Sequence, residues 1–191
     1  SRVNDKMLSL MKTYKMKELK FNKEMQRAID EGRKTQTRRV IDPQPYIDKM
    51  GNWVWNGVNF GQNDKPHIQE MASSIPWRRL GTNETGHYPQ YGIVGEINNS
   101  VKITGIRVER LQDISEEDSV MEGVYGFYDN QFYSSKGLGA HRYRNYLNGA
   151  NEKLDAYSSF KSLWQSIYKG HEQKDWNINP WVWVITFESV K

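Results

Sequence analysis

The chain contains no cysteine among its 191 residues. This absence excludes disulfide bonds, thiolate nucleophiles and zinc sites built from cysteine. Long apolar runs are missing too, since no stretch of about 18 apolar residues occurs, which is the length that a membrane-spanning helix requires. The first residues also lack the continuous apolar segment of a secretory signal peptide. We therefore expect a cytoplasmic protein with no membrane partner.

Histidine is scarce and scattered. The four histidines are far apart, and no two of them are separated by a single helical turn: His67, His87, His141 and His171. A helical pair at that spacing is a common way of bringing two imidazoles to one metal ion. We therefore expect exposed loop histidines and no metal site, and no other motif calls for a cofactor.

Aromatic residues are abundant, with seven Trp, eleven Tyr and six Phe. Each of these side chains buries about 150–250 Å², so a hydrophobic fraction of only 37% is enough to build a core. The length fits one domain. We expect an N-terminal extension over residues 1–15 and a single domain over residues 16–191, with insertions near 61–92 and 125–150, where little periodicity appears.

Capping residues predict two short helices. Asn22 precedes a helix over residues 23–31, and Gly32 follows where a left-handed residue ends a helix. Ser115 opens a second helix, and Gly123 ends it. We expect the acidic residues of its first turn to satisfy the N-terminus of that helix.

Apolar patterns predict the remaining elements. Residues 160–168 place apolar side chains on one face of a third helix. The nearly continuous apolar run over residues 181–187 predicts a central strand. Alternation over residues 101–108 changes phase at Gly105, which indicates a strand with a bulge. Residues 19–21 alternate as a short first strand would.

Residues 32–39 carry four cations and two hydroxyls directly after the first helix. A helix C-terminus favours nearby cations by about 0.3–1 kcal/mol, so capping accounts for part of the charge but not for the hydroxyls. The stretch predicts an anion-facing loop or edge strand. Its candidate binding residues are Arg33, Lys34, Thr35, Arg38 and Arg39.

A second segment, residues 139–146, interleaves cations with aromatic rings. Proteins that bind single strands combine arginines on phosphates with aromatic side chains on bases. Arg142, Tyr143 and Arg144 are therefore candidates for nucleic-acid contacts, with an ordinary amphipathic loop or helix as the alternative. The net charge of +4 favours a polyanionic partner.

Three segments resemble phage-encoded proteins of the ASCH superfamily, which have a PUA-like domain: residues 21–39, 107–118 and 179–187. The resemblance implies an α+β fold, a small mixed β-barrel with helices packed at its side. It also implies that the loop after the first helix lines a cleft for nucleic acid, with RNA favoured, or for a modified nucleoside. The protein would then act in the cytoplasm of the host cell.

One branch of this superfamily consists of bacterial amidohydrolases that remove the acetyl group from N(4)-acetylcytidine. Their motif Gly-Arg-Lys-Thr-x-Thr matches residues 32–37. The resemblance implies Lys34, Thr37 and Glu122 as catalytic residues. The threonine hydroxyl would attack the amide carbonyl, the lysine would take its proton and the carboxylate would assist the transfer. Solvated surface positions for all three are the alternative.

Residues 91–100 depart from the phage group, whose members continue from a Gly-Asp turn into a strand that reads Trp-Val-Arg-Glu. The difference implies that one barrel strand and one Arg/Glu pair near the cleft are absent or supplied by other residues. Three functions stay open. The first is nucleic-acid or nucleoside binding through residues 32–39, the second is hydrolysis of an acylated nucleoside, and the third is binding of a host or virion protein through the two insertions.

Overall fold

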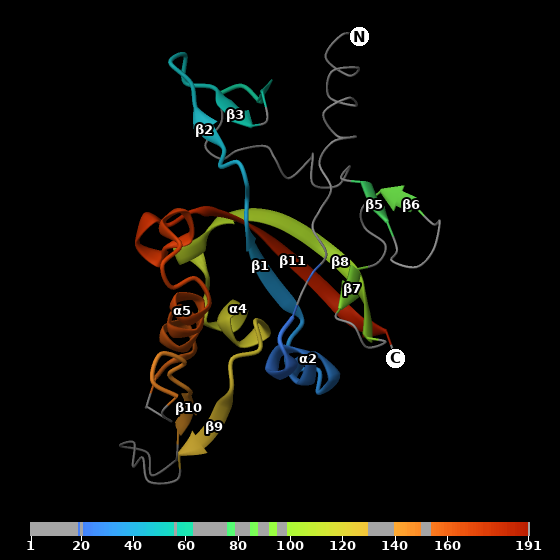
Figure 1. The fold of residues 1–191 in the computed structure, drawn as a ribbon, viewed down its shortest axis with the longest axis vertical. Helices are drawn as coiled ribbons and strands as arrows, with labels where there is room; N and C mark the ends of the chain where they lie inside the picture. Colours follow the sequence, from blue (N-terminus) through green and yellow to red (C-terminus); the bar gives the residue numbers. More distant parts are fainter. Residues whose placement is uncertain are drawn as a thin grey trace.

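The computed structural model of the chain describes residues 19, 21–55, 57–62, 76–78, 85–87, 92–94, 99–129, 140–149 and 154–190. Within these ranges, three α-helices accompany several antiparallel sheets (Figure 1). The fold is therefore α+β, which confirms the class predicted from the sequence.

The main sheet has four strands, in the order β1 (Gln36–Val40), β11 (Trp181–Val190), β8 (Asn99–Arg110) and β7 (Gly92–Val94), and all neighbours are antiparallel. β11 lies between β1 and β8, which confirms the central strand predicted from its apolar run. The first five residues of β11 are all buried. The register between β11 and β8 shifts next to Gly105, as the predicted bulge requires.

The strands that the structure describes do not form the closed barrel that we expected. In this part of the chain β1 and β7 are the outer strands of the main sheet. The strands that follow β1 pair with one another instead of extending the sheet: β2 (Tyr46–Ile47) and β4 (Val58–Asn59) both pair with β3 (Trp53–Trp55). The sheet is thus left open on the side where β1 lies.

Aromatic packing explains where this small sheet sits. Trp53 packs edge to face against Trp181, with ring centroids 5.4 Å apart, and Trp55 does the same against Trp183 at 5.5 Å. Such edge-to-face pairs add about 0.5–1.5 kcal/mol beyond the area they bury. The sheet of β2, β3 and β4 is therefore held against the first residues of β11.

Two hairpins lie in the regions that we expected to be insertions. β5 (Pro76–Arg78) pairs with β6 (Thr85–His87), and β9 (Gly126–Asp129) pairs with β10 (Ala140–Tyr143). These strands are only three or four residues long. Strands this short give little periodicity in the sequence, which is why neither hairpin was predicted.

The helices are α2 (Lys23–Asp30), α4 (Glu116–Met121) and α5 (Ala156–Ile167), with short 3₁₀ turns η1 (Leu111–Asp113), η2 (Glu172–Lys174) and η3 (Trp176–Ile178). The predicted caps are confirmed. Asn22 accepts a hydrogen bond from the backbone N–H of Met25 at the start of α2, and Ser115 accepts one from Asp118 at the start of α4.

The predicted first strand over residues 19–21 is wrong. Leu19 and Phe21 are both buried, but neither belongs to a strand. The ring of Phe21 packs against Phe187, with centroids 6.0 Å apart. The alternation in this segment therefore reflects two side chains that enter the core, not strand pairing.

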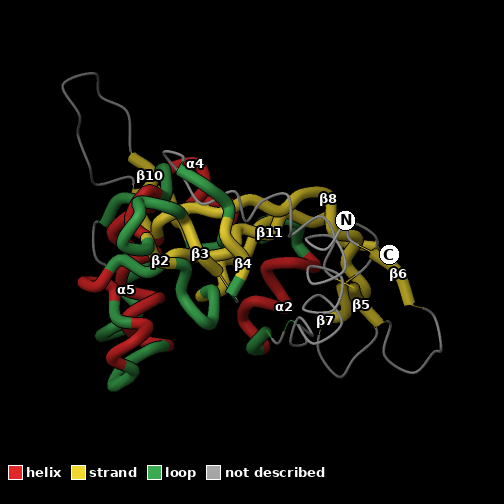
Figure 2. The backbone as a smooth tube through the Cα atoms, turned by 90° about the horizontal axis from the view of Figure 1, so that it is seen from above, coloured by secondary structure: helices red, strands yellow, loops and turns green. Residues whose placement is uncertain are grey.

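Figure 1 shows β1 between α5 and α2. In Figure 2, where the molecule is seen from above, the two helices again lie apart from each other. The segment that holds most of the candidate residues thus runs along the outer edge of the main sheet, between two helices. This placement decides which of its side chains are buried.

Candidate functional site: a buried charge network beside a cavity

A cavity of about 860 Å³ lies along β1, and residues of α5 and of the segment that leads into α2 also line it. Its wall includes five aromatic side chains, namely those of Phe21, Phe160, Trp164, Tyr168 and Trp183. Its polar lining includes Lys34, Thr37, Arg39 and Glu122. Small-molecule sites commonly have about 300–1,000 Å³ and combine mostly apolar walls with a few placed polar groups. We call this space the β1 cavity.

Lys34 reaches the β1 cavity because α2 ends abruptly before it. Gly32 has a φ of 72°, and the backbone N–H groups of Arg33 and Lys34 both donate to the carbonyl of Ala28. The chain turns back, and Lys34 forms an isolated antiparallel bridge with Glu122. The end of α2 at Gly32, which the sequence predicted, therefore also brings Lys34 into the interior, where it is only 4% exposed.

The ammonium group of Lys34 has an acceptor for each of its three N–H donors. Its Nζ donates to Oε2 of Glu122 at 3.0 Å, to the carbonyl of Glu122 at 2.7 Å and to the carbonyl of Gln36 at 2.8 Å. A protonated lysine has three donors, so these acceptors match its charged form. Burial lowers the pKa of Lys34, and the nearby carboxylate of Glu122 opposes this shift.

Glu122 lies at the end of α4, where Gly123 allows Lys34 to approach. Gly123 has a φ of 85°, and a Cβ atom there would lie 2.7 Å from Cβ of Lys34. Only glycine combines this left-handed conformation with so close a contact. The other carboxylate oxygen of Glu122, Oε1, accepts a hydrogen bond from Nη1 of Arg38 at 3.1 Å.

Arg38 is the centre of the network, and its side chain is completely inaccessible to solvent. Its Nη2 donates to Asp118 at 2.7 Å and to Glu109 at 3.0 Å, and its Nη1 also donates to the side chain of Gln36 at 2.6 Å. Burial opposes the charged guanidinium, but the carboxylates of Glu122, Asp118 and Glu109 outweigh it and raise the pKa of Arg38.

Arg107 closes the network on the solvent side by pairing with Glu109 and Asp118. Three cations thus face three carboxylates: Lys34, Arg38 and Arg107 against Glu109, Asp118 and Glu122. Burial raises the pKa of Asp118, but its bonds to Arg38 and the charge of Arg107 outweigh this, and the net shift is downward. Buried charges survive when each is paired and hydrogen-bonded, and each of these six is paired with an opposite charge, although Nε of Arg38 has no hydrogen-bond partner among the described residues.

Thr37 lies in β1 opposite Ile185 of β11, and it lines the β1 cavity together with Lys34 and Glu122. It is 1% exposed. Its hydroxyl forms no hydrogen bond within the residues that the structure describes. The three residues that the resemblance implies as catalytic therefore share one cavity.

The other candidate residues divide between two places. Arg39 lines the β1 cavity, with its guanidinium carbon 5.2 Å from the ring centroid of Phe21. Thr35 acts through its backbone, which bonds to Met121 and Phe187. Arg33 lines a second pocket on α2, and Arg144 lines the same pocket. Arg142 and Tyr143 belong to β10, and neither lines the β1 cavity or the second pocket.

The acidic run of α4 has a different role from the one that we predicted. The carboxylate of Asp118 pairs with Arg38 instead of serving only the helix terminus. Oε2 of Glu116 accepts hydrogen bonds from the backbone N–H groups of Ala156 and Tyr157, so it caps α5 and not its own helix. These contacts link residues more than thirty positions apart, which local capping rules do not consider.

Sequence reasoning also missed Glu109 and Arg107. Their spacing of two residues in a predicted strand places them on one face, and this signal alone could have paired them. Arg107 and Glu109 of β8 form an ion pair with each other, and neither residue lines the β1 cavity.

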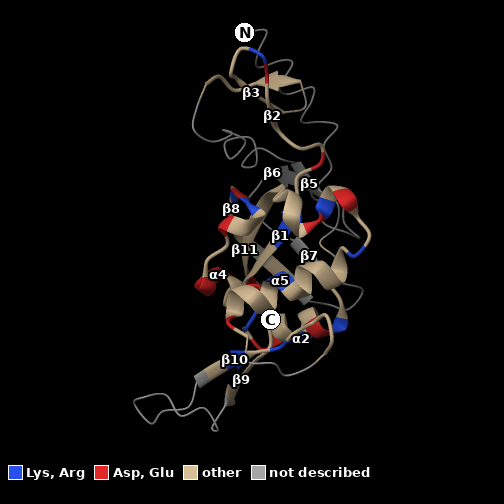
Figure 3. Ribbon diagram, turned by 90° about the vertical axis from the view of Figure 1, so that its left-hand side faces the viewer, with Lys and Arg blue, Asp and Glu red and all other residues tan. Residues whose placement is uncertain are grey.

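Basic and acidic residues are intermixed along the ribbon in Figure 3.

No protein-family model, curated protein or solved structure matched this chain. The described residues also include no helix long and apolar enough to span a bilayer.

Proposed function

We propose that this protein is an ASCH-like protein of PUA type that binds a nucleoside-sized ligand in the β1 cavity. The observation that carries the proposal is the meeting of aromatic walls with a fixed set of polar groups in about 860 Å³. Stacking of a base on an aromatic side chain contributes about 1–3 kcal/mol per base. Thr37, Arg39 and Glu122 add donors and acceptors that a polar heteroaromatic ring can match.

A single nucleoside fits these residues better than a long strand. The two terminal nitrogens of Arg38 donate to three carboxylates, and Lys34 is paired with Glu122. A polyanion gains affinity from rows of cations that release counterions, and Lys34 and Arg38 are both neutralised by buried carboxylates. Part of the basic run predicted over residues 32–39 thus lines the cavity, with Arg39 as a cation there that a ligand could contact.

Binding is tested by calorimetric titration of cytidine and N(4)-acetylcytidine into the purified protein. Thr37→Val keeps the shape of the side chain but removes its hydroxyl, so we expect affinity to fall about two- to tenfold. Thr35→Val is the matched control, since Thr35 does not line the cavity. Failure of the folded protein to bind any nucleoside would exclude the proposal.

A second candidate is hydrolysis of an N(4)-acylated cytidine, which the placement of Thr37, Lys34 and Glu122 in one cavity supports. Thr37 Oγ1 would attack the acyl carbon, and its proton would pass to a base. The C–N bond would then break, and cytidine would leave with a proton on its amino nitrogen. Water would hydrolyse the acyl-threonine to release the carboxylic acid.

The protonation state of Lys34 makes hydrolysis the less favoured of the two candidate functions. Lys34 donates three hydrogen bonds, so it must first lose a proton before it can accept one from Thr37. The carboxylate of Glu122 raises the pKa of Lys34 against the effect of burial and thereby favours the charged lysine. Conversion of N(4)-acetylcytidine to cytidine, followed by chromatography, tests the reaction. Activity that Lys34→Ala and Thr37→Val both abolish would establish it.

A further inference from the structure

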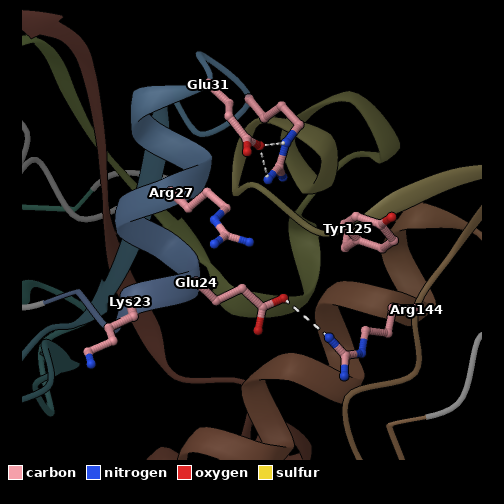
Figure 4. A pocket seen from close by; sticks show the side chains of 7 residues that line it. Lys23, Glu24, Arg27, Glu31, Tyr125 and Arg144 are labelled. Atoms are coloured by element: carbon pink, nitrogen blue, oxygen red, sulfur yellow. Dashed lines mark hydrogen bonds and ion pairs between the residues drawn. The ribbon is translucent and has the colours of Figure 1, made fainter.

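A second pocket, of about 470 Å³, lies against α2 and shares no lining residue with the β1 cavity. Figure 4 shows its side chains, which come from α2, from the turn after α2, and from the segments that flank the β9–β10 hairpin. We call it the α2 pocket. Segments about a hundred residues apart in the chain thus form one concave surface.

The α2 pocket carries an excess of positive charge. Four of its lining residues are cations and two are acids, which leaves two positive charges in excess: Lys23, Arg27, Arg33 and Arg144 against Glu24 and Glu31. This excess is local, because the buried network described above is neutral. An anion is therefore the ligand class that the pocket favours.

Two ion pairs frame the α2 pocket and fix its flanking arginines. Arg33 donates to Oε2 of Glu31 from Nε at 2.8 Å and from Nη2 at 2.6 Å. Arg144 lies 3.6 Å from Glu24, and its guanidinium also lies 5.7 Å from the ring centroid of Tyr146. A guanidinium has five donors, so both arginines keep N–H groups for a ligand.

Arg27 differs from its neighbours. In Figure 4 its guanidinium lies between Glu31 and the Arg144–Glu24 pair. Among the residues that the structure describes, its side chain has no hydrogen bond or ion pair. Arg27 therefore presents an uncompensated charge at the centre of the pocket.

Tyr125 supplies an aromatic surface at the same place. It is 45% exposed and lines the α2 pocket. Its backbone is held at both ends, because its N–H donates to the hydroxyl of Tyr146 at 2.8 Å and its carbonyl accepts from the N–H of Arg144 at 3.0 Å. The backbone that carries the ring is thus fixed relative to Arg144, and the exposed ring is accessible for stacking.

We propose that the α2 pocket binds the phosphate group of a nucleotide, with Arg27 as its central contact and Arg33 and Arg144 beside it. Guanidinium groups match the geometry of phosphate oxygens and form strong charge-assisted hydrogen bonds with them. Tyr125 packs against the base or sugar that the phosphate carries. The phosphate belongs either to a free mononucleotide or to a nucleic-acid strand, and the pocket recognises the same group in both. The inference stands independently of ligand binding in the β1 cavity.

The test uses cytidine 5′-monophosphate, measured by calorimetry, and a fluorescein-labelled oligouridylate, measured by anisotropy. We expect Arg27→Gln to weaken binding about ten- to a hundredfold, because it removes a charged hydrogen-bond donor. For the oligonucleotide, the slope of log affinity against log salt should also fall by about one. Lys49→Gln is the control, since it removes one exposed positive charge in the turn between β2 and β3.

The outcomes separate the sources of phosphate and the two sites. Binding of the mononucleotide that Arg27→Gln weakens and Lys49→Gln preserves supports a free nucleotide. The same pattern with the oligonucleotide alone supports a strand. Absence of saturable binding for both probes, or equal losses in the two variants, overturns the proposal. Cytidine lacks a phosphate, so its affinity for the β1 cavity should be unchanged in Arg27→Gln, whichever result is obtained.

Discussion

Lys34 and Glu122 meet in the interior although 88 residues separate them in the chain, and their Nζ and Oε2 atoms are 3.0 Å apart. Both side chains are almost inaccessible, at 3% and 4% exposure. Arg38 holds the other oxygen of the same carboxylate. One buried carboxylate therefore compensates two buried cations, and this relationship makes Glu122 the residue on which the wall of the β1 cavity depends.

Removal of this carboxylate should be costly. Glu122→Gln leaves Lys34 and Arg38 with less negative charge than they need, so we expect the free energy of unfolding to fall by on the order of 3 kcal/mol. Glu117→Gln is the matched control, because Glu117 is an exposed acid on the same helix. Urea denaturation of the two variants provides the comparison. Equal losses would show that Glu122 is not the compensating charge.

The close contact at Gly123 gives a second prediction. Gly123→Ala should lower the free energy of unfolding for two reasons: an L-residue with positive φ costs about 1–2 kcal/mol, and the added Cβ collides with Lys34. Gly170→Ala isolates the first cost, since Gly170 has a φ of 81° with no atom within 4 Å of its Cβ position. Overpacking typically adds about 1–3 kcal/mol, so Gly123→Ala should be the less stable variant by that margin.

The affinity for a nucleoside should also differ between Gly123→Ala and Gly170→Ala. A displaced Lys34 changes the wall of the β1 cavity, whereas Gly170→Ala leaves that wall intact. Titration of cytidine into both variants under conditions where both are folded therefore checks the contact. Equal affinities would mean that Lys34 has no influence on the ligand.

Acid should destabilise the protein through Asp118. Its pKa in the folded protein is lower than the ordinary value of about 3.9 for aspartate, because of its bonds to Arg38 and the charge of Arg107. The unfolded chain therefore binds a proton more readily, and stability declines as the pH falls from about 4 through the folded pKa. Denaturation curves measured from neutral to acidic pH should show this decline, and Asp118→Asn should flatten it. Glu117→Gln should retain the wild-type slope.

The features that could be predicted from the sequence are the ones with short-range signals. Asn22 and Ser115 each act within three residues, so α2 and α4 were placed correctly. The apolar run of β11 and the phase change at Gly105 are also local patterns. Each of them is confirmed by the pairing of the main sheet.

The network around Arg38 could not be predicted in the same way. Its contacts with Glu109, Asp118 and Glu122 join residues 71 to 84 positions apart. A basic residue followed far along the chain by acids gives no pattern that distinguishes a buried pair from two solvated surfaces. For that reason the sequence indicated a charged, anion-facing loop. In the structure, the charges of Lys34 and Arg38 are instead neutralised by buried carboxylates beside the β1 cavity.

A pH–rate profile tests the second candidate function and the coupling of Lys34 to Glu122 together. If Lys34 is the base, hydrolysis of N(4)-acetylcytidine should rise with pH and level off below about 10.4, the ordinary pKa of lysine, because burial lowers the pKa of Lys34. The charge of Glu122 raises that pKa, so Glu122→Gln should move the rising limb to lower pH even where it reduces the maximal rate. If the rising limb of the pH–rate profile does not shift after this substitution, another group accepts the proton of Thr37. Lys34 would then contribute to the cavity by hydrogen bonding and not as the base.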